Sequence, residues 1–347
     1  MTDFYKGKKV LITGHTGFKG TWLTKILIMA GADVLGYSRC SEKDPDFFAM
    51  SGVESEITHV KGDIRDYDHL LEVFSSFQPE IVFHLAAQPI VWESYVNPRE
   101  TYETNVMGTV NVLECIRLTP SVKSAVIITT DKVYRNDESG KSFTEDDVLD
   151  GFDPYSNSKS CAELATSSYK RSFPVLPPIS TARAGNVIGG GDFAKDRIIP
   201  DCVRAVMHGE PIIVRNPNSI RPYQHVLEPL FAYLLIAEKQ HADPSLAGAY
   251  NIGPDECDCI TTAELVSLFC EKWGEGARWI DKSDPDAPHE AGFLKLDCSM
   301  MKTTFDWQPK WNIEKCMEQT VRFSRLWLNR EQVAKEMNDE IQRYLDS

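Results

Sequence analysis

The stretch VIITTDKVYRND, residues 126–137, ends an apolar run with three side chains that could transfer protons. The four β-branched residues 127–130 favour an extended chain, so we predict a buried strand there. Thr130, Asp131 and Lys132 then bring a hydroxyl, a carboxylate and an amine together where the strand gives way to its turn. A solvated loop would carry the same residue types. The triplet therefore indicates chemistry only if suitable partner groups are found elsewhere in the chain.

A second pair of side chains suited to proton transfer is Tyr155 and Lys159, in the segment DPYSNSKSCAE. On a helix, residues four apart lie on one face, so the lysine ammonium would lie beside the phenol. That charge favours the phenolate and lowers the tyrosine pKa, which is otherwise about 10 and too high for a base at neutral pH. A surface helix with an unrelated tyrosine and lysine is the alternative. With a redox cofactor nearby, the pair would act at a hydroxyl-bearing carbon.

Glycines near the start of the chain indicate where such a cofactor would bind. The loop GHTGFKG directly follows the predicted strand 9–14 and leads into a helix. Glycine lets the backbone turn tightly and approach a pyrophosphate, which the unpaired N–H groups of a helix N-terminus stabilise. Glycine triplets also mark ordinary strand–helix turns, but the position of this one predicts a dinucleotide site. We expect its contacts to come from Gly14, Thr16, Gly17, Phe18, Lys19 and Gly20.

The elements that must position these residues alternate between strands and helices. Near-continuous apolar runs suit strands that are covered on both faces, and helix-period segments separate them. The predicted strands are 9–14, 33–38, 80–87, 124–130 and 179–186. This order predicts an α/β protein with a doubly wound, parallel, Rossmann-type sheet.

The second half of the chain indicates a smaller, mostly helical domain for a substrate. Residues 1–185 would form the dinucleotide-binding domain, and residues of about 225–254 would return to it. Residues 186–224 and 255–347 would form the substrate-binding domain, beginning with loops rich in Gly, Pro, Asn and Arg. We expect the ligand site in the cleft between the two domains.

Composition limits the classes of partner. The 347 residues, 42% hydrophobic and 25% charged, are typical of a globular protein, and the net charge of −14 argues against a nucleic-acid surface. Neither a signal peptide nor an uncharged apolar run of about 18 residues occurs, so we expect a cytoplasmic protein without a membrane span. The nine cysteines are scattered, which indicates reduced thiols. The isolated pair Cys257 and Cys259 has no second ligand cluster, so we expect no metal.

The GxxGxxG spacing together with YxxxK resembles the extended short-chain dehydrogenases/reductases. Other motifs agree with this resemblance, namely KGDIRD, HLAAQ and TNVMGT. It implies adenine contacts at Asp63 and Ile64, a chain that passes the nicotinamide side at Leu85, Ala86, Ala87 and Gln88, and a structural asparagine at Asn105. It also implies a homodimer or homotetramer that pairs through a four-helix interface including the YxxxK helix.

One position departs from that resemblance. The end of the second strand would carry an acid for the ribose hydroxyls, whereas this sequence has Ser38 and Arg39. An arginine could accept a ribose phosphate. We therefore expect NAD, with NADP as the alternative.

A Thr-Asp pair followed by a further acid–base residue resembles, more narrowly, the sugar-nucleotide 4,6-dehydratases. The resemblance implies that Tyr155 takes the C4 hydroxyl proton, that Thr130 polarises the C4 oxygen, and that Asp131 is the acid for the C6 hydroxyl, which leaves as water. Hydride passes from C4 to the nicotinamide and back to C6. Many relatives have a glutamate as the C5 base where this chain has Lys132, which is either that base or a stabiliser of the enolate.

The substrate is implied by the same resemblance. The Thr-Asp-Lys form, with DRIIPDC, RNPNSIRPYQHVLEPL and PHEAGFLKLDCS, is similar to family members that act on CDP-glucose. The implied contacts with its diphosphate and the loop around it are Asn186, Arg197, Arg221 and His225, and guanidinium groups suit phosphate oxygens. The alternatives are a dehydratase of a GDP- or dTDP-sugar, a sugar-nucleotide 4-epimerase, and a non-enzymatic dinucleotide-binding redox sensor.

Overall fold

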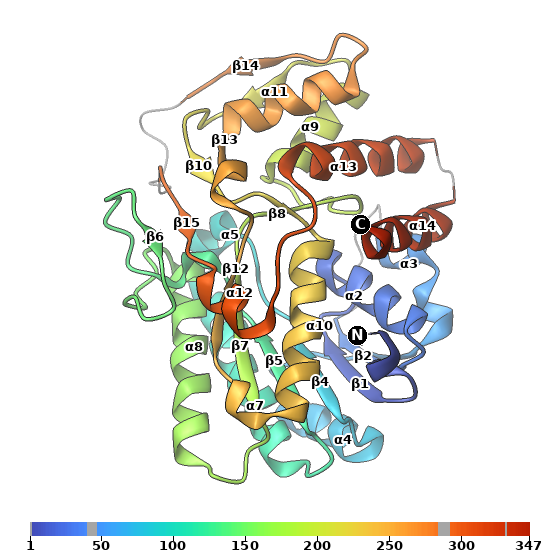
Figure 1. Ribbon diagram of the computed structural model, residues 1–347, viewed down its shortest axis with the longest axis vertical. Coiled ribbons are helices and arrows are strands. Elements are labelled where there is room, and N and C mark those ends of the chain that lie inside the picture. Colours follow the sequence, from blue (N-terminus) through green and yellow to red (C-terminus); the bar gives the residue numbers. More distant parts are fainter. Residues whose placement is uncertain (1, 40–46, 284–291, 330–331) are drawn as a thin grey trace.

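The computed structural model describes residues 2–39, 47–283, 292–329 and 332–347. Residues 288–291 of the PHEAGFLKLDCS motif lie outside this part of the chain. At the centre is a parallel sheet of seven strands (Figure 1). The strands are β1 (Lys9–Thr13), β2 (Asp33–Ser38), β3 (Thr58–Lys61), β4 (Ile81–His84), β5 (Ser124–Ile128), β7 (Ile179–Ala184) and β12 (Ala249–Ile252).

The strand order confirms the predicted fold class. The order β12-β7-β5-β4-β1-β2-β3 places β1 in the interior, and the chain reverses its direction of winding between β1 and β4. All six pairings in this sheet are parallel. In such sheets, ligands bind at the carboxyl ends of the strands near the reversal. The glycine loop follows β1, and the Thr130 triplet follows β5, at that edge.

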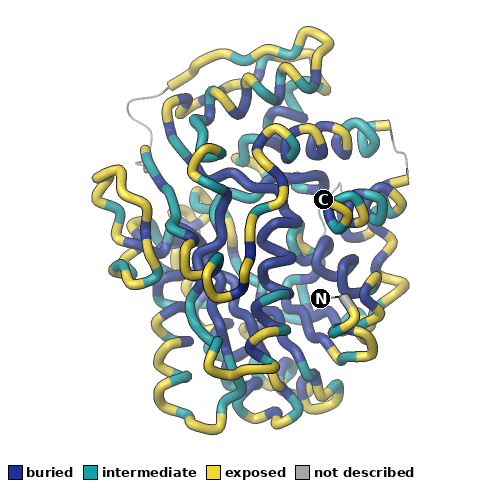
Figure 2. Tube along the Cα trace, viewed as in Figure 1, coloured by how far each residue is buried: buried dark blue, intermediate teal, exposed yellow. Residues whose placement is uncertain are grey.

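Helices cover both faces of the sheet because its strands are apolar on both sides. Val10 and Ile12 pack into one core cluster, and Leu11 between them packs into the other. The first cluster includes helices α2 (Phe18–Met29) and α10 (Leu227–Ala242). The second includes α4 (Tyr67–Phe77), α7 (Gly108–Leu118) and α8 (Pro154–Ser172). Figure 2 shows the buried strands between helices whose outer faces are exposed.

The predicted strand starts hold to within one residue, and four of the five strands end earlier than predicted, whereas 33–38 is confirmed in full. The predicted strand 80–87 ends at His84, because the chain then bends toward the glycine loop, where Leu85 N donates to Thr13 O at 3.0 Å. The helix that carries the TNVMGT motif includes a π-helical turn, Glu103–Met107, directly before α7. Such turns are rare and frequently lie at functional sites.

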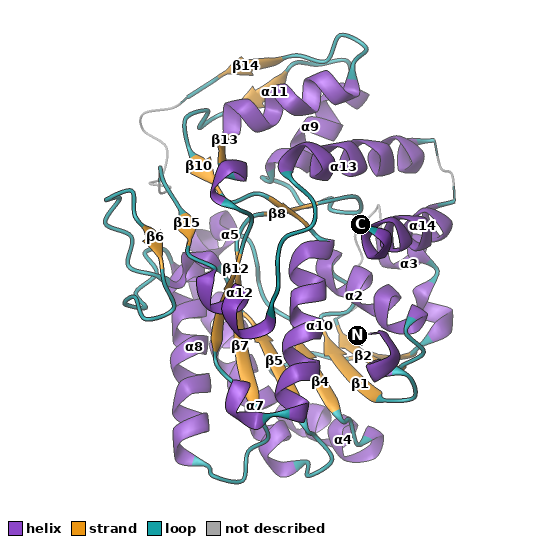
Figure 3. Ribbon diagram, in the orientation of Figure 1, coloured by secondary structure: helices purple, strands orange, loops and turns teal. Residues whose placement is uncertain are grey.

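A smaller assembly of helices and two-stranded ladders lies beyond the carboxyl ends of the strands (Figures 1 and 3). Its helices are α9 (Ile198–Met207), α11 (Thr262–Trp273) and α13 (Ile313–Leu328). Its ladders pair β9 (Ile212–Val214) with β14 (Trp279–Asp281), and β10 (Ile220–Arg221) with β13 (Ile260–Thr261). Helix α10 packs on the sheet and β12 joins its edge. The domain boundaries themselves stay a prediction.

The remaining elements connect or flank these layers. The helices are α1 (Thr2–Tyr5), α3 (Phe47–Ser51), α5 (Val91–Val96), α6 (Pro98–Tyr102), α12 (Ser299–Phe305) and α14 (Val333–Asp346). Short strands are β6 (Ser142–Phe143), β8 (Val187–Ile188), β11 (Gln224–His225) and β15 (Lys295–Leu296). The 3₁₀ turns are Val53–Glu56, Asp131–Val133, Pro244–Leu246 and Glu256–Asp258. In the described residues, no helix has the length and apolar character needed to cross a membrane.

Candidate active site

The loop after β1 has the geometry of a phosphate-binding turn. Gly14 has a φ of 78°, and a Cβ atom there would lie 2.7 Å from the Ala86 nitrogen. A Cβ atom at Gly20 would lie 2.1 Å from the Gly14 carbonyl oxygen, so the backbone contacts require both glycines. Helix α2 begins at Phe18 without a side-chain cap from Gly17, which leaves its first N–H groups for an anion. The loop therefore fits the pyrophosphate of a dinucleotide.

The end of β2 carries the side chains that would meet the adenosine ribose. Ser38 Oγ lies 2.8 Å from Thr16 Oγ1 of the glycine loop. The side chain of Arg39 is 55% exposed, and its guanidinium lies 3.3 Å from the Glu100 carboxylate. Because this carboxylate already meets the charge of the arginine, a ribose phosphate would have to compete with it. The site fits NAD better than NADP.

The two predicted residues of the motif after β3 lie in different surroundings. Asp63 forms an ion pair near the surface, and Ile64 lies in the core. Arg65 Nη2 donates to the Asp63 carboxylate at 2.6 Å. Burial acts to raise the pKa of Asp63, but the hydrogen bonds and charge of Arg65 outweigh it, so the pKa is lowered. Ile64 is buried, and a Cβ atom at Gly108 would lie 2.4 Å from its Cδ1. The Ile64 side chain therefore packs against α7, which leaves only its backbone for a ligand.

Asn105 joins the end of β4 to the helix that carries Tyr155. Its Nδ2 donates to Gln88 O at 3.0 Å and to Ser158 Oγ at 2.9 Å, and its Oδ1 accepts from Gln88 N at 2.8 Å. The side chain is buried, so it holds the chain in place rather than facing a ligand. Leu85, Ala86 and Ala87 run between β4 and this anchor, close to the glycine loop.

Helix α8 brings Tyr155 and Lys159 to the end of β5. The helix begins at a cap in which the Asp153 carboxylate accepts a backbone hydrogen bond. Lys159 Nζ donates to Ile128 O at 3.1 Å, and Tyr155 forms a hydrogen bond with Thr130. The structure therefore unites the strand-end triplet with the YxxxK pair.

The electrostatics of this pair differ in one respect from the expectation. Burial raises the pKa of Tyr155 to about 12, whereas its hydrogen bond with Thr130 and the charge of Arg197 act to lower it. Burial lowers the pKa of Lys159 to about 8, and the charge of Glu163 acts in the opposite direction. The strongest influences that lower the tyrosine pKa here come from Thr130 and Arg197, while Lys159 lies deeper and contacts the backbone.

The triplet forms a compact acid–base pair in a 3₁₀ turn. Asp131 is 1% exposed, and its Oδ1 accepts from the Thr130 hydroxyl at 2.9 Å and from Lys132 Nζ at 3.1 Å. Asp131 Oδ2 is buried and has no hydrogen-bond partner in the described residues. Lys132 Nζ also lies 3.3 Å from Asn186 Oδ1. Buried carboxylate oxygens are normally paired, so Oδ2 is suited to a ligand hydroxyl.

Lys19 lies near this carboxylate and near two further basic side chains. The pKa of Lys19 falls to about 7, first through burial and then through the charges of Lys159 and Arg197, while Asp131 acts to raise it. In the described part of the chain, no carboxylate lies within 4.0 Å of Lys19 Nζ. Arg197 pairs with Asp192 at 3.0 Å. A cluster with excess positive charge fits an anionic ligand such as a diphosphate.

The other two predicted substrate contacts lie deeper. Arg221 is 2% exposed and donates from Nη1 to Ile220 O at 3.1 Å in β10. His225 is fully buried, and its Nε2 lies 3.0 Å from the Glu340 carboxylate of α14. Asn186 and Arg197 therefore join the triplet, whereas His225 faces the C-terminal helix. The substrate roles of all four stay predictions.

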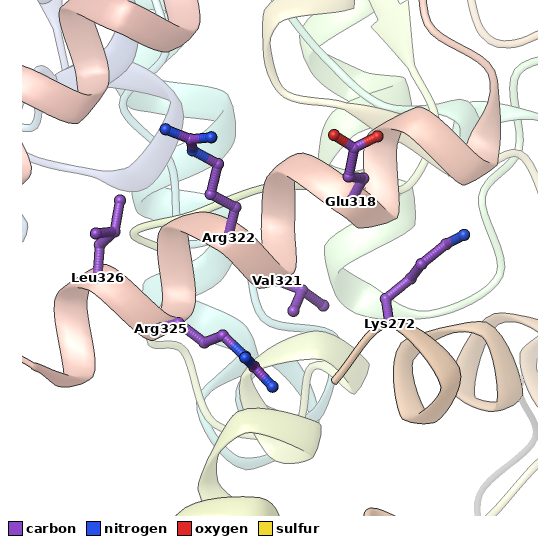
Figure 4. A pocket seen from close by; sticks show the side chains of 6 residues that line it. All are labelled: Lys272, Glu318, Val321, Arg322, Arg325 and Leu326. Atoms are coloured by element: carbon purple, nitrogen blue, oxygen red, sulfur yellow. The ribbon is translucent and has the colours of Figure 1, made fainter. Parts of the chain in front are cut away.

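A groove between α11 and α13 lies apart from these residues (Figure 4). Lys272, Glu318, Val321, Arg322, Arg325 and Leu326 line it. Its cations already face carboxylates, since Lys272 lies 3.5 Å from Glu314, Arg322 lies 2.9 Å from Glu336, and Arg325 lies 3.1 Å from Glu275. We assign no reaction to this groove.

Two further buried residues, Glu163 and Tyr233, lie at the site. Glu163 lies one helical turn after Lys159, and this spacing was a usable signal. Tyr233 of α10 has a buried hydroxyl without a hydrogen-bond partner in the described residues, and its ring lies 5.9 Å from Lys19 Nζ. No local pattern marks Tyr233, because it lies within an apolar helix.

A glycine loop after β1 and a YxxxK helix beside a strand-end hydroxyl define an extended short-chain dehydrogenase/reductase. Residues 11–320 match the family described as GDP-mannose 4,6 dehydratase. The chain is 41% identical to the CDP-glucose 4,6-dehydratase of Salmonella typhimurium, over 99% of this chain and 98% of that protein. The chain belongs to the GDP-mannose 4,6 dehydratase family and is an enzyme of the nucleotide-sugar 4,6-dehydratase class.

Solved structures agree in fold. The UDP-glucose 4-epimerase of Thermus thermophilus, a complex with NAD, is 25% identical, with a TM-score of 0.80 over 91% of this chain and 99% of that one. The dTDP-glucose 4,6-dehydratase of Bacillus anthracis, in complex with NAD, is 21% identical, with a TM-score of 0.78 over 94% and 99%. At this identity, the second similarity supports the fold alone.

Proposed function

We propose that the protein converts CDP-glucose to CDP-4-dehydro-6-deoxy-glucose, with NAD as a cofactor that is regenerated in each turnover. The observation that carries this proposal is the buried Asp131, with one carboxylate oxygen unpartnered, beside Thr130 and Tyr155. A simple oxidoreductase needs the hydroxyl, the tyrosine and the lysine but no additional acid. The 41% identical relative named for CDP-glucose supports this substrate.

The first part of the proposed reaction oxidises C4 of the sugar. Tyr155 takes the proton of the C4 hydroxyl, and Thr130 orients the C4 oxygen by a hydrogen bond. Lys159 binds the ribose of the dinucleotide, and the glycine loop holds its pyrophosphate. Bound NAD would supply the hydride chemistry, at C4 in one direction and at C6 in the other.

The second part eliminates water across C5 and C6. A 4-keto group acidifies the C5 proton, so a base at C5 and an acid at the C6 hydroxyl complete the elimination. The Lys132 ammonium lies 3.1 Å from Asp131, so transfer of one proton between them yields a neutral amine and a carboxylic acid. Asp131 is buried and Lys132 is partly exposed, so a substrate that covers Lys132 and excludes water favours the neutral form of the pair. Lys132 then takes the C5 proton and Asp131 protonates the leaving hydroxyl.

This assignment predicts opposite outcomes for two substitutions of Lys132. Lys132→Met removes the base, so exchange of the C5 proton with deuterated solvent should fall by about 100-fold or more, while reduction of the dinucleotide continues. Lys132→Glu supplies another base and should restore part of the exchange. Mass spectrometry of the recovered sugar measures both. Wild-type exchange in Lys132→Met, or a greater loss in Lys132→Glu than in Lys132→Met, would exclude Lys132 as the base.

The overall function is tested by incubating the protein with NAD and each of four glucose nucleotides, carrying CDP, dTDP, GDP or UDP. We expect loss of one water from CDP-glucose, detected by mass spectrometry, and no net consumption of NAD. Turnover of another nucleotide would keep the dehydratase class and change the substrate. Formation of an isomer without water loss would identify a 4-epimerase instead. Dinucleotide binding without any turnover would favour a redox sensor.

We propose that the protein is a homodimer that pairs through α8 and the helices beside it. Trp92, Tyr102, Met107 and Leu164 are apolar side chains between 36% and 54% exposed. They lie on α5, α6, the π-helical turn and α8, which pack against one another. Exposed apolar side chains that gather on neighbouring elements are typical of a protein interface. A homotetramer and a cytoplasmic location remain further predictions.

A charge on this surface should therefore separate the subunits. We expect Met107→Glu with Leu164→Glu to shift the molar mass, measured by light scattering after gel filtration, from dimer to monomer. Val175→Glu is the matched control, because Val175 is 83% exposed and lies beyond the other end of α8. A monomeric wild-type protein, or a double variant that stays dimeric, would contradict the proposed interface.

A further inference from the structure

Glu163 is a buried carboxylate on the catalytic face of α8, four residues after Lys159. It is 3% exposed. Its Oε1 accepts from the hydroxyl of Thr129, which lies on the strand end that leads into the triplet. Its Oε2 accepts from Thr181 Oγ1 at 2.7 Å and from Arg183 Nη2 at 2.9 Å. Both oxygens of this buried carboxylate are therefore satisfied by donors from two strands.

These contacts join the elements that carry the site. Thr129 follows β5, and Thr181 and Arg183 belong to β7, so one side chain of α8 fixes the helix to two neighbouring strands. Arg183 Nη1 continues the network to the Tyr134 hydroxyl at 2.8 Å. Removing one partner of such a buried ion pair leaves the other charge uncompensated, so its geometry is strongly held.

The same carboxylate acts on Lys159. The titratable groups that interact electrostatically with this lysine are Glu163 of α8, His84 of β4 and Lys19 of α2. Burial, followed by the charge of Lys159, lowers the pKa of His84 to about 3, so this histidine is neutral. Glu163 is the charge that opposes the effect of burial on the pKa of Lys159.

We propose that Glu163 is a positioning residue of the reaction, whose carboxylate fixes α8 to the ends of β5 and β7 and supplies the negative charge that keeps Lys159 an ammonium. This rests on the proposed function, in which Lys159 binds the dinucleotide ribose. An ammonium donates more hydrogen bonds than an amine and adds charge to them, so a neutral Lys159 would hold the ribose less well. Glu163 touches neither substrate nor cofactor and acts through Lys159.

The test compares Glu163→Gln with a control that breaks the network but keeps the charge. Glu163→Gln has the same size and removes the charge, so Lys159 should lose its proton at a lower pH. We expect the fall in kcat at alkaline pH, near pH 8 in the wild type, to move down by about one unit. The Kd for NADH, measured by fluorescence between pH 6 and 10, should weaken over the same shifted range. Thr181→Val removes one hydrogen bond to the carboxylate and should lower the Tm without moving either pH dependence.

Two further variants keep the inference testable. Glu163→Asp retains the charge and should return the alkaline transition toward the wild-type pH. If Glu163→Gln does not fold, Glu163→Gln with Arg183→Met removes both buried charges and should fold. Because this variant also loses the Arg183 cation, its downward shift should be smaller than that of Glu163→Gln alone. The inference is overturned if Glu163→Gln, or that double variant, lowers the Tm and leaves the alkaline transition in place. NADH binding needs no sugar, so it tests Glu163 even if no nucleotide sugar is turned over.

Discussion

Tyr155→Phe is expected to lower kcat by about 1,000-fold, because it removes the base for the C4 hydroxyl and leaves the rest of the site intact. The phenol lies next to Thr130, and burial raises its pKa to about 12. No other hydroxyl in the proposed mechanism can replace it at C4. Oxidation is the first chemical step, so both product formation and reduction of the dinucleotide should be lost together. Stopped-flow absorbance of the reduced nicotinamide measures the second directly.

The matched control is Tyr169→Phe on the same helix. Tyr169 lies about four turns after Tyr155, and its hydroxyl lies 3.4 Å from Glu114, away from the triplet. We expect wild-type kcat for this variant. Rapid reduction of NAD by Tyr155→Phe in the presence of CDP-glucose would show that another group takes the C4 proton, and would remove Tyr155 from its role.

The fold could be predicted from the sequence because its signals are local. Apolar runs such as 124–130 mark strands that are buried on both faces, and the structure confirms the parallel sheet with β5 beside β4 and β7. A Cβ atom at Gly14 or Gly20 would overlap neighbouring backbone atoms, so the glycines of the loop motif directly indicate a close backbone contact. Strand ends were less predictable, because the bend after His84 depends on Thr13 from another strand.

The site was predictable where its residues are neighbours in sequence and less so where they are not. Thr130, Asp131 and Lys132 are consecutive, and Tyr155 and Lys159 share a helix face, so their spacing carries the information. By contrast, His225 faces Glu340, which lies 115 residues later in α14, and no local pattern encodes that partner.

The same distinction explains why Glu163 and Lys19 were not understood from the sequence. The spacing of Glu163 from Lys159 is local, but its meaning depends on Thr181 and Arg183 of β7. In the sequence, Lys19 is one residue of a glycine loop. In the structure, its charged neighbours include Arg197, which comes from the loop before α9. The protonation states of these groups therefore depend on charges that the fold brings together from distant parts of the sequence.

Asp131→Asn should separate the two halves of the reaction. The amide keeps the shape of the side chain and can still contact the Thr130 hydroxyl, so C4 oxidation should remain within about 10-fold of the wild type. It cannot protonate the leaving C6 hydroxyl, and it cannot take the proton of Lys132. Water elimination should therefore slow by about 100- to 10,000-fold. Reduced dinucleotide would then accumulate to the concentration of active sites, with little 6-deoxy product.

This accumulation distinguishes a dehydratase from the enzymes that share its oxidative half. A 4-epimerase returns hydride to C4 and uses no acid at C6, so Asp131→Asn would leave it largely active and its dinucleotide oxidised. Asp137→Asn is the matched control, because Asp137 is exposed and its carboxylate caps Ser139. Two results would contradict the role of Asp131: near-normal product formation, or loss of C4 oxidation to the extent expected for Tyr155→Phe. If C4 oxidation survives the replacement of Asp131 and water elimination does not, then Asp131 acts at C6 alone. Thr130 and Tyr155 remain in place in this variant, so they can still carry out the oxidation at C4.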